Sequence, residues 1–167
     1  MHNELTKKDI EKMQAELDDR IIRQRPLLIE EVKRCREFGD LSENFEYKEA
    51  KRAKNRNESR IRYLQNMIKT AHIIEDTSTE DTVGLYDRIG LYIEEDDEVE
   101  YYKIVTTVRI DPLSGLVSKD APMGKAILGK RVGDRVKIDV NENYSYYVVV
   151  RSIEKGEDDG SAELTQY

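Results

Sequence analysis

The sequence contains no tryptophan, one cysteine and only two phenylalanines, and these shortages narrow the range of possible functions. Because Cys35 is the single cysteine, no disulfide can form within the chain, and this cysteine usage suits a reducing compartment. Neither a His/Cys spacing typical of zinc sites nor a glycine-rich phosphate-binding loop is present. The apolar runs are short and the N-terminus has no apolar signal-peptide core. We therefore expect a cytoplasmic protein that does not engage a membrane.

Charge is unevenly distributed along the chain, whose formal net charge is −7. The first 76 residues carry 17 Lys and Arg against 16 Asp and Glu, whereas the remainder carries 11 against 19. Residues 48–62 hold seven bases and only two acids, and we call these seven the basic stripe: Lys48, Lys51, Arg52, Lys54, Arg56, Arg60 and Arg62. An acidic chain with one basic stripe is unsuited to coating DNA but suits a local phosphate contact.

Residues 1–76 have the periodicity of an antiparallel helical hairpin. Positions three and four residues apart form a seam, as in a coiled coil. They are Ile10, Met13, Leu17, Ile21, Leu28, Val32 and Cys35 in the first arm, and Tyr47, Ala50, Lys54, Asn57, Ile61, Leu64, Ile68 and Ala71 in the second. Lys54 and Asn57 are polar seam positions that we expect to fix the register. Pro26 should bend or break the first arm near Arg25.

A polar linker at residues 77–82 precedes a region with the pattern of strands. Residues 83–93, 99–110, 135–140 and 144–151 are rich in β-branched and aromatic side chains. Between them, Asp120 has the position of an N-cap for a short helix with Pro122 in its first turn. We therefore predict an α+β fold: the hairpin, then a small α+β domain at 83–155, then a disordered acidic tail at 156–167.

The segment between the two arms, residues 39–47, contains two candidate metal ligands. Asp40 and Glu43 lie three residues apart, and carboxylates so spaced can hold part of a Mg²⁺ coordination shell. Such a pair is incomplete by itself and suits a site completed by phosphates or by a partner protein. The same spacing fits a capping box in which Asp40 caps the second helix. Capping is the commoner origin of the pattern, and the two roles are compatible.

Arginines behind this segment are candidates for phosphate contacts. Arg52 and Arg56 share a helix face, and Arg36 lies one turn before the segment on the other arm. Basic helix faces are more often simply solvated, and the sequence leaves this alternative open. Phe45 either closes the end of the coiled coil or stacks on a base.

Residues 39–47, GDLSENFEY, closely resemble the tip signature of the Gre-type bacterial transcription elongation factors. Residues 120–130, DAPMGKAILGK, followed by Val132-Gly133-Asp134, resemble the second signature block of that family. The likeness covers residues 5–154, and two specific motifs in the right order make coincidence a poor explanation. Phe45 and Ala121 depart from the family pattern, which commonly has a small residue and a serine at these positions.

The resemblance implies an N-terminal antiparallel coiled coil and a C-terminal FKBP-like domain. It implies a factor that binds bacterial RNA polymerase and inserts the coiled coil into the secondary channel. Asp40 and Glu43 would help hold a Mg²⁺ shared with the polymerase, which then cleaves the 3′ end of backtracked RNA. Asp120 and Pro122, with Met123 beside them, fall in the loop that meets the polymerase in the family. No cofactor of its own, no small-molecule substrate and no enzyme activity of its own are implied.

Three alternatives remain. Related proteins with this fold inhibit the polymerase, although retention of both Asp40 and Glu43 favours cleavage stimulation. The FKBP-like shape raises a prolyl isomerase or chaperone, but such a site needs an apolar pocket walled by aromatics. This chain lacks Trp, and Phe38 and Phe45 both lie near the tip. A coiled coil that only associates with itself would not need the tip sequence.

Overall fold

A computed structural model describes residues 3–37, 39 and 44–166 of the chain. Two compact units make it up: Ile10–Ala71 form one, and Asn3–Asp9 together with His72–Gln166 form the other. The first unit is helical, and the second combines a five-stranded sheet with a short helix. The fold is therefore α+β, as predicted. None of the helices in the described part of the chain is long and apolar enough to span a membrane.

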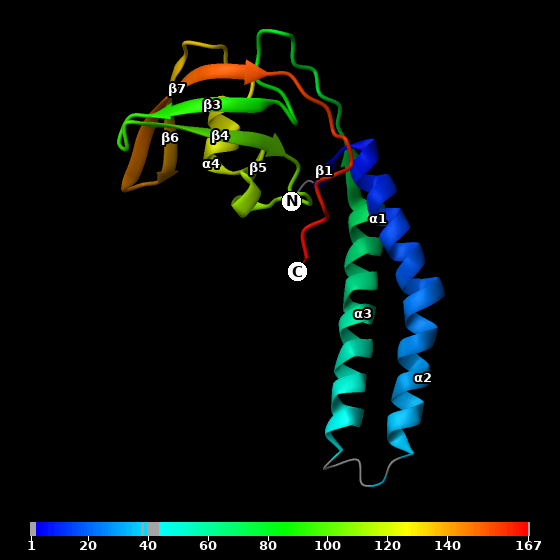
Figure 1. Ribbon diagram of the computed structural model, residues 1–167. Coiled ribbons are helices and arrows are strands. Elements are labelled where there is room, and N and C mark those ends of the chain that lie inside the picture. Colours follow the sequence, from blue (N-terminus) through cyan, green and yellow to red (C-terminus); the bar gives the residue numbers. More distant parts are fainter. Residues whose placement is uncertain (1–2, 38, 40–43, 167) are drawn as a thin grey trace. The chain divides into compact units, whose positions relative to one another are not determined.

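The helical unit is a hairpin of two antiparallel arms (Figure 1). The first arm consists of α1 (Lys7–Asp19), the π-helical segment η1 (Arg20–Gln24) and α2 (Arg25–Arg36), and the second is the single helix α3 (Phe45–Thr70). Pro26 lies in the first turn of α2, where its missing N–H leaves no helical hydrogen bond unmade. The wider π-helical turn directly before it confirms the predicted interruption near Arg25.

Most of the predicted seam is buried between the arms, namely Met13, Leu17, Val32, Cys35, Ala50, Asn57, Ile61 and Leu64. Asn57 is only 3% exposed, and its Oδ1 accepts a hydrogen bond from Arg20 Nη1 at 2.9 Å. Its Nδ2 donates to the Arg20 carbonyl oxygen at 3.4 Å. Slippage of one arm would leave this buried amide without partners, so Asn57 fixes the register as predicted. Lys54, the other predicted polar seam position, is half-buried.

One member of the basic stripe points into the hairpin. The Arg60 side chain is 6% exposed, and its Nε donates to Glu16 Oε1 at 2.8 Å. Arg20 Nε donates to the same Glu16 oxygen, also at 2.8 Å. A buried guanidinium is stable only when it is paired, so Arg60 joins the two arms. Arg60 therefore contributes little to the exposed charge of the basic stripe.

The second unit is organised around a sheet with strand order β5-β4-β3-β7-β6. Its strands are β3 (Arg88–Ile93), β4 (Glu98–Val105), β5 (Leu116–Ser118), β6 (Arg135–Asn141) and β7 (Tyr144–Glu154). Only the β4–β5 pairing is parallel. A turn of 3₁₀ helix, η2 (Pro112–Ser114), precedes β5, and β1 (Asn3–Leu5) pairs with β2 (Ala71–Ile73) in a separate two-stranded sheet.

Every second residue of the central strands points into the core. Ile89, Leu91 and Ile93 of β3 are buried with Val148 and Val150 of β7. The helix α4 (Pro122–Ile127) covers this inner face and adds Ile127 to the core. Residues 83–87 are not a strand, contrary to the sequence prediction, because Tyr86 has a φ of 65° and turns the chain there. The three-residue β5 was not predicted.

The start of α4 differs from the prediction in one respect. Pro122 is its first residue, as expected, but the N-cap is Ala121, which makes no side-chain capping bond. Asp120 instead accepts a hydrogen bond from Lys119 Nζ at 3.2 Å, and its N–H donates to Ser118 Oγ at 3.0 Å. A Cβ at Gly124 would lie 2.1 Å from the Ser118 carbonyl oxygen, so glycine is needed for this close packing.

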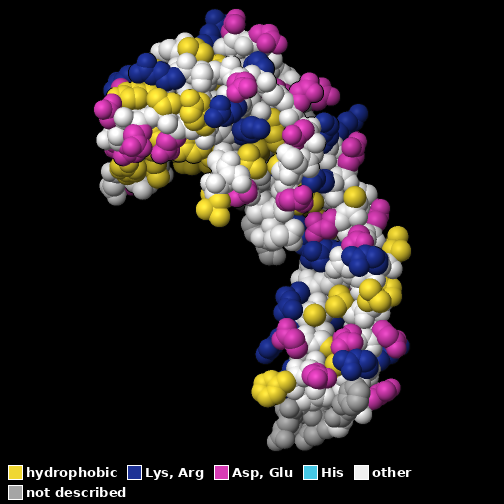
Figure 2. Space-filling model, viewed as in Figure 1, with side chains coloured by type: hydrophobic (Ala, Val, Ile, Leu, Met, Phe, Trp, Pro, Cys, Tyr) yellow, Lys and Arg dark blue, Asp and Glu magenta, His cyan; other side chains and the backbone are white. Residues whose placement is uncertain are grey.

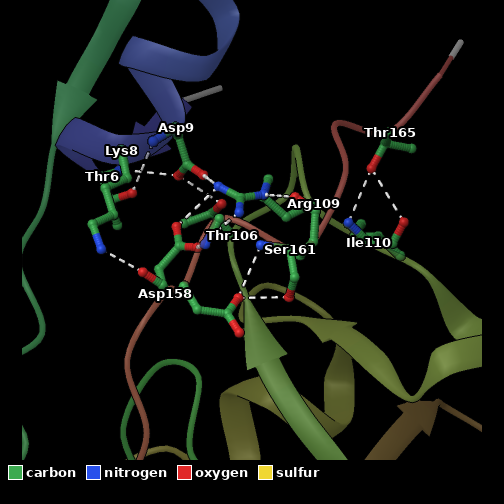
Figure 3. A network of polar contacts seen from close by, with 12 residues as sticks. Thr6, Lys8, Asp9, Thr106, Arg109, Ile110, Asp158, Ser161 and Thr165 are labelled. Carbon is green, nitrogen blue, oxygen red and sulfur yellow. Dashed lines mark hydrogen bonds and ion pairs between the residues drawn. The ribbon is translucent and has the colours of Figure 1, made fainter.

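The C-terminal tail is ordered in the structure as far as residue 166, although its composition predicts disorder. Asp158 is 9% exposed and accepts hydrogen bonds from Arg109 Nη1 and Nη2 (Figure 3). Leu164 is 7% exposed, and the Thr165 N–H donates to the Val108 carbonyl oxygen at 2.8 Å. The tail is held because the fully buried Arg109 needs carboxylates, which Asp158 and Asp9 supply.

Candidate functional site at the end of the helical hairpin

A small cluster closes the hairpin beside the predicted functional segment. Val32 and Cys35 of α2 pack against Ala50 of α3, with the half-buried Tyr47 alongside. Burial raises the pKa of the Cys35 thiol, and the neighbouring Glu31 carboxylate raises it further. The thiol therefore stays protonated at neutral pH, which makes Cys35 a packing residue and a poor nucleophile.

Asn44 links the two arms across the turn. Its Oδ1 accepts a hydrogen bond from the Tyr47 N–H at 3.0 Å, which caps α3. Its Nδ2 donates to the Cys35 carbonyl oxygen at 2.8 Å, which satisfies an acceptor in the last turn of α2. The capping role expected of Asp40 therefore belongs to Asn44, and α3 begins only at Phe45.

Asp40 and Glu43 themselves lie outside the described residues. The residues that flank them place the segment between the end of α2 at Arg36 and the start of α3 at Phe45. Within the described ranges, no group of three or more His, Cys, Asp or Glu side chains is placed to hold a metal ion. The metal-binding role of the two acids stays a prediction.

Arg36 and Phe45 stand on either side of this segment. Arg36 is exposed and lies over the Tyr47 ring, with its Cζ 5.7 Å from the ring centroid. A hydrogen bond from Arg36 lowers the pKa of the Tyr47 hydroxyl. Phe45 is 85% exposed, so its ring does not close the coiled coil against any described residue. It is available for stacking.

The predicted phosphate-binding arginines of α3 do share a face. The side chains of Arg52 and Arg56 are 70% and 67% exposed. Both contact Glu49, at 3.5 Å from Arg52 and 3.3 Å from Arg56. They line a shallow groove together with Asn55, Ser59, Arg60 and Tyr63. The face is thus positive, with one carboxylate that partly neutralises it.

The predicted partner-binding residues occupy the start of α4 in the other unit. Asp120 and Pro122 are exposed, so both side chains can meet a partner. Met123 is half-buried and packs against the core of the unit, which anchors the loop.

Sequence reasoning missed three residues that shape the hairpin and its face: Glu16, Asn44 and Glu49. Asn44 carried a usable signal, because an Asn three residues before Tyr47 at a helix start fits an N-cap. The spacing of Glu49 three and seven residues before Arg52 and Arg56 also predicts contact on one helix face. Glu16 had no local signal, since its partner Arg60 lies 44 residues away.

Comparisons with known proteins cover both units. Residues 3–73 match the family model described as transcription elongation factor, N-terminal, and residues 78–155 match that of transcription elongation factor, GreA/GreB, C-term. The transcription elongation factor GreA of Oenococcus oeni is 41% identical over 152 residues, covering 90% of this chain and 94% of the relative. GreA of Bacillus cytotoxicus is 41% identical over 135 residues, covering 80% and 85%.

Among solved structures, the Gfh1 protein of Thermus thermophilus is 26% identical, with a TM-score of 0.43 and coverage of 93% of this chain and 100% of that one. The two family-model matches define the class as a two-domain transcription elongation factor. The chain belongs to the GreA/GreB family.

Proposed function

We propose that this chain binds bacterial RNA polymerase, reaches the active centre through the secondary channel with its helical hairpin, and stimulates cleavage of backtracked RNA. The observation that carries the proposal is family membership over both units, combined with a hairpin end that contains both Asp40 and Glu43. The cleavage chemistry belongs to the polymerase, and this chain contributes side chains to it.

The hairpin is built to deliver its end over a distance. The helix α3 has 26 residues and is about 39 Å long at 1.5 Å per residue. Polar contacts join the arms along its length, including Arg25 with Glu58 at 2.8 Å. The Asn57 and Arg60 contacts described above fix the register. A rod whose arms cannot slide supports accurate placement of the residues at its end.

Asp40 and Glu43 would hold a Mg²⁺ that is shared with the polymerase. Carboxylate oxygens are preferred ligands of this hard cation, and two carboxylates fill only part of its coordination shell. The two acids therefore fit half of a shared site. A bound Mg²⁺ supplies activation of a water for attack on the RNA phosphate and stabilisation of the leaving oxygen.

Other residues have supporting roles in this proposal. Arg36, Arg52 and Arg56 contact the backbone of the RNA 3′ segment. Asp120 and Pro122 contact the polymerase surface, and Met123 holds their loop against the core. Exposure of the arginines, Asp120 and Pro122 supports these roles.

The test uses stalled, backtracked polymerase and the variant Asp40→Asn. The cap of α3 does not depend on Asp40, so the variant removes a metal-binding charge without removing that cap. We expect RNA cleavage to slow by at least about tenfold, equivalent to about 1.4 kcal/mol of barrier, with polymerase binding intact. Glu30→Gln neutralises an exposed acid of α2 and should stimulate cleavage by the polymerase as the wild type does.

If polymerase bound to Asp40→Asn cleaves its RNA at the wild-type rate, the proposed role of Asp40 is ruled out. If the wild-type protein binds the polymerase and slows synthesis without shortening any transcript, the inhibitory alternative is correct instead.

A further inference from the structure

The five-stranded sheet has a second face, opposite α4, on which lysine, arginine and tyrosine side chains lie. We call this the outer face. The strand registers place Tyr101 beside Gly90, Val99 and Val149 on either side of Tyr92, and Tyr147 beside Lys137. The basic, tyrosine and valine side chains on it are Arg88, Tyr92, Val99, Tyr101, Lys103, Arg135, Lys137, Tyr147, Val149 and Arg151. The same registers place the acids Asp139 and Glu154 on this face. Tyr101 is 50% exposed and Tyr147 is 37% exposed.

Three arginine–tyrosine pairs run in a row across this face. The guanidinium carbon of Arg88 lies 4.0 Å from the ring centroid of Tyr101 on the neighbouring strand. Arg151 lies 4.8 Å from the Tyr92 ring. Arg135 lies 3.8 Å from the Tyr147 ring. Each pair joins two adjacent strands, and the three pairs extend from β4 to β6. Strands lie about 4.8 Å apart, so these four strands span roughly 14 Å.

The charge of this face is opposite to that of its unit. Beyond residue 76 the chain has 11 Lys and Arg residues against 19 Asp and Glu residues. Five of those 11 basic residues are on the outer face. Figure 2 shows basic and hydrophobic side chains next to one another over β7. Carboxylates pair with some of the bases, as Glu94 does with Arg135 at 2.8 Å and Glu154 with Arg88 at 3.6 Å. Arg151 forms no ion pair within the described residues.

We propose that the outer face binds single-stranded RNA. Unpaired bases stack on tyrosine rings and on the flat faces of guanidinium groups, and their phosphates pair with arginine and lysine. The guanidinium groups of Arg88, Arg135 and Arg151 already lie over tyrosine rings, which restricts their motion before a base arrives. Positive charge alone would also attract an acidic peptide, but a peptide offers no series of flat rings to match the row. The inference does not depend on the action of the hairpin end.

The ends of the outer face are unequal. Arg88, Tyr101 and Lys103 line a cavity of about 700 Å³ together with tail residues that include Glu157 and Asp159. These carboxylates repel phosphate. At the other end Glu94 and Asp139 are already paired with Arg135 and Lys137, and Asp97 accepts a hydrogen bond from the Tyr92 hydroxyl. The RNA therefore lies over Tyr92 and Tyr147, with Arg151 as the central basic residue. Arg151 and Tyr147 are therefore the residues to change.

The first experiment measures binding of the full chain, without polymerase, to a fluorescent oligouridylate of about twelve nucleotides, a length within the range covered by known sheet platforms. We expect Arg151→Glu to weaken binding at least about fivefold and Tyr147→Ala to do the same, the effect of losing one stacked base. Tyr147→Phe keeps the ring and should bind as the wild type does. Lys130→Glu makes the same charge change as Arg151→Glu at an exposed site away from the face and should also bind normally.

The second experiment maps the contact directly. Ultraviolet crosslinking of an RNA with 5-iodouridine, followed by mass spectrometry, should identify Tyr92 or Tyr147. Crosslinks confined to residues 45–70 would overturn the proposal, because the hairpin would then be the binding site. Equal competition by a polyglutamate peptide would indicate an acidic protein partner and would also overturn it. Neither readout involves transcript cleavage, so failure here leaves the proposed function standing.

Discussion

Arg109 and Asp158 form a buried two-pronged ion pair, with Arg109 Nη1 and Nη2 donating to the two carboxylate oxygens of Asp158 at 2.9 and 2.8 Å. Arg109 is fully buried and also donates to Asp9 Oδ1 at 3.0 Å and, from Nε, to the Ala162 carbonyl oxygen at 2.7 Å (Figure 3). One guanidinium thus joins Asp9 and the C-terminal tail, both of which belong to the second unit.

The first prediction concerns removal of this pair. Asp158→Ala leaves a buried guanidinium with one carboxylate fewer, and breaking a buried ion pair typically costs 3–5 kcal/mol. Because Asp9 remains, we expect a loss of about 3 kcal/mol in the free energy of unfolding of the second unit. Urea denaturation followed by tyrosine fluorescence measures it.

The neighbouring Asp159 provides the control for Asp158. It is exposed and accepts a hydrogen bond from the Ser161 N–H at 2.9 Å, which an asparagine can also accept. Asp159→Asn should therefore stay within about 0.5 kcal/mol of the wild type. If Asp158→Ala is equally mild, the tail does not contribute to stability and the ion pair is incidental.

The second prediction concerns acid and the helical hairpin. Burial raises the pKa of Glu16, but hydrogen bonds from Arg60 and Arg20 outweigh it, so its pKa lies below the usual 4.5. A carboxylate with a lowered pKa in the folded state stabilises that state above its unfolded pKa. This stabilisation is lost as the pH falls from about 4.5 through the lowered value.

Thermal unfolding of the helices, followed by circular dichroism across this pH range, tests the prediction. Near neutral pH, Glu16→Gln should be the less stable protein, because Arg60 and Arg20 lose a charged acceptor. The difference between the two proteins should shrink as the pH falls below 4.5, since protonation removes the same charge from the wild type. Curves that remain parallel would show that Glu16 is not the titrating group.

The hairpin seam could be read from the sequence because its spacing is local and repeats. The orientation of Arg60 could not, because an arginine on a helix is normally solvated and its partner lies on the opposite arm. The predicted disorder of the C-terminal tail was wrong for a related reason. Its composition indicates disorder, and its order depends on Arg109, 49 residues before Asp158.

The hairpin end was recognised from its motif, but its cap was assigned to the wrong residue. Both Asp40 and Asn44 are good N-cap residues by type. The choice depends on where the arms meet, since Asn44 also bonds to Cys35 across the turn. The residue that caps α3 is therefore set by contacts between the two arms, which the sequence pattern alone does not show.

The third prediction uses the two hydrogen bonds of Asn44. Asn44→Ala loses both the cap and the bond to the Cys35 carbonyl, and we expect a loss of about 1–2 kcal/mol in hairpin stability. Asn44→Ser keeps a capping oxygen but lacks the amide donor, so it should fall between the alanine variant and the wild type. Thermal unfolding of the helical signal measures both. Equal losses for the two variants would mean that the cap contributes little.

The last prediction addresses the arginines of α3 and the acid between them. If Arg52 and Arg56 contact the RNA 3′ segment, changing both to Ala should weaken crosslinking of that segment to the protein in backtracked complexes. Glu49 contacts both guanidiniums, at 3.5 and 3.3 Å, and competes with phosphate for them. Glu49→Gln should therefore strengthen the crosslink, because it releases both arginines. A purely structural role for the arginines does not predict an increase.

Lys69→Ala removes an exposed base at the other end of the same helix and serves as the matched control. It should crosslink at the wild-type level, since it lies about 20 Å from Arg56 along a helix that rises 1.5 Å per residue. Raising the salt concentration should reduce the effect of Glu49→Gln, because these side chains are exposed and their interactions are screened. Full-strength crosslinking by the double arginine variant would show that the two side chains are simply solvated.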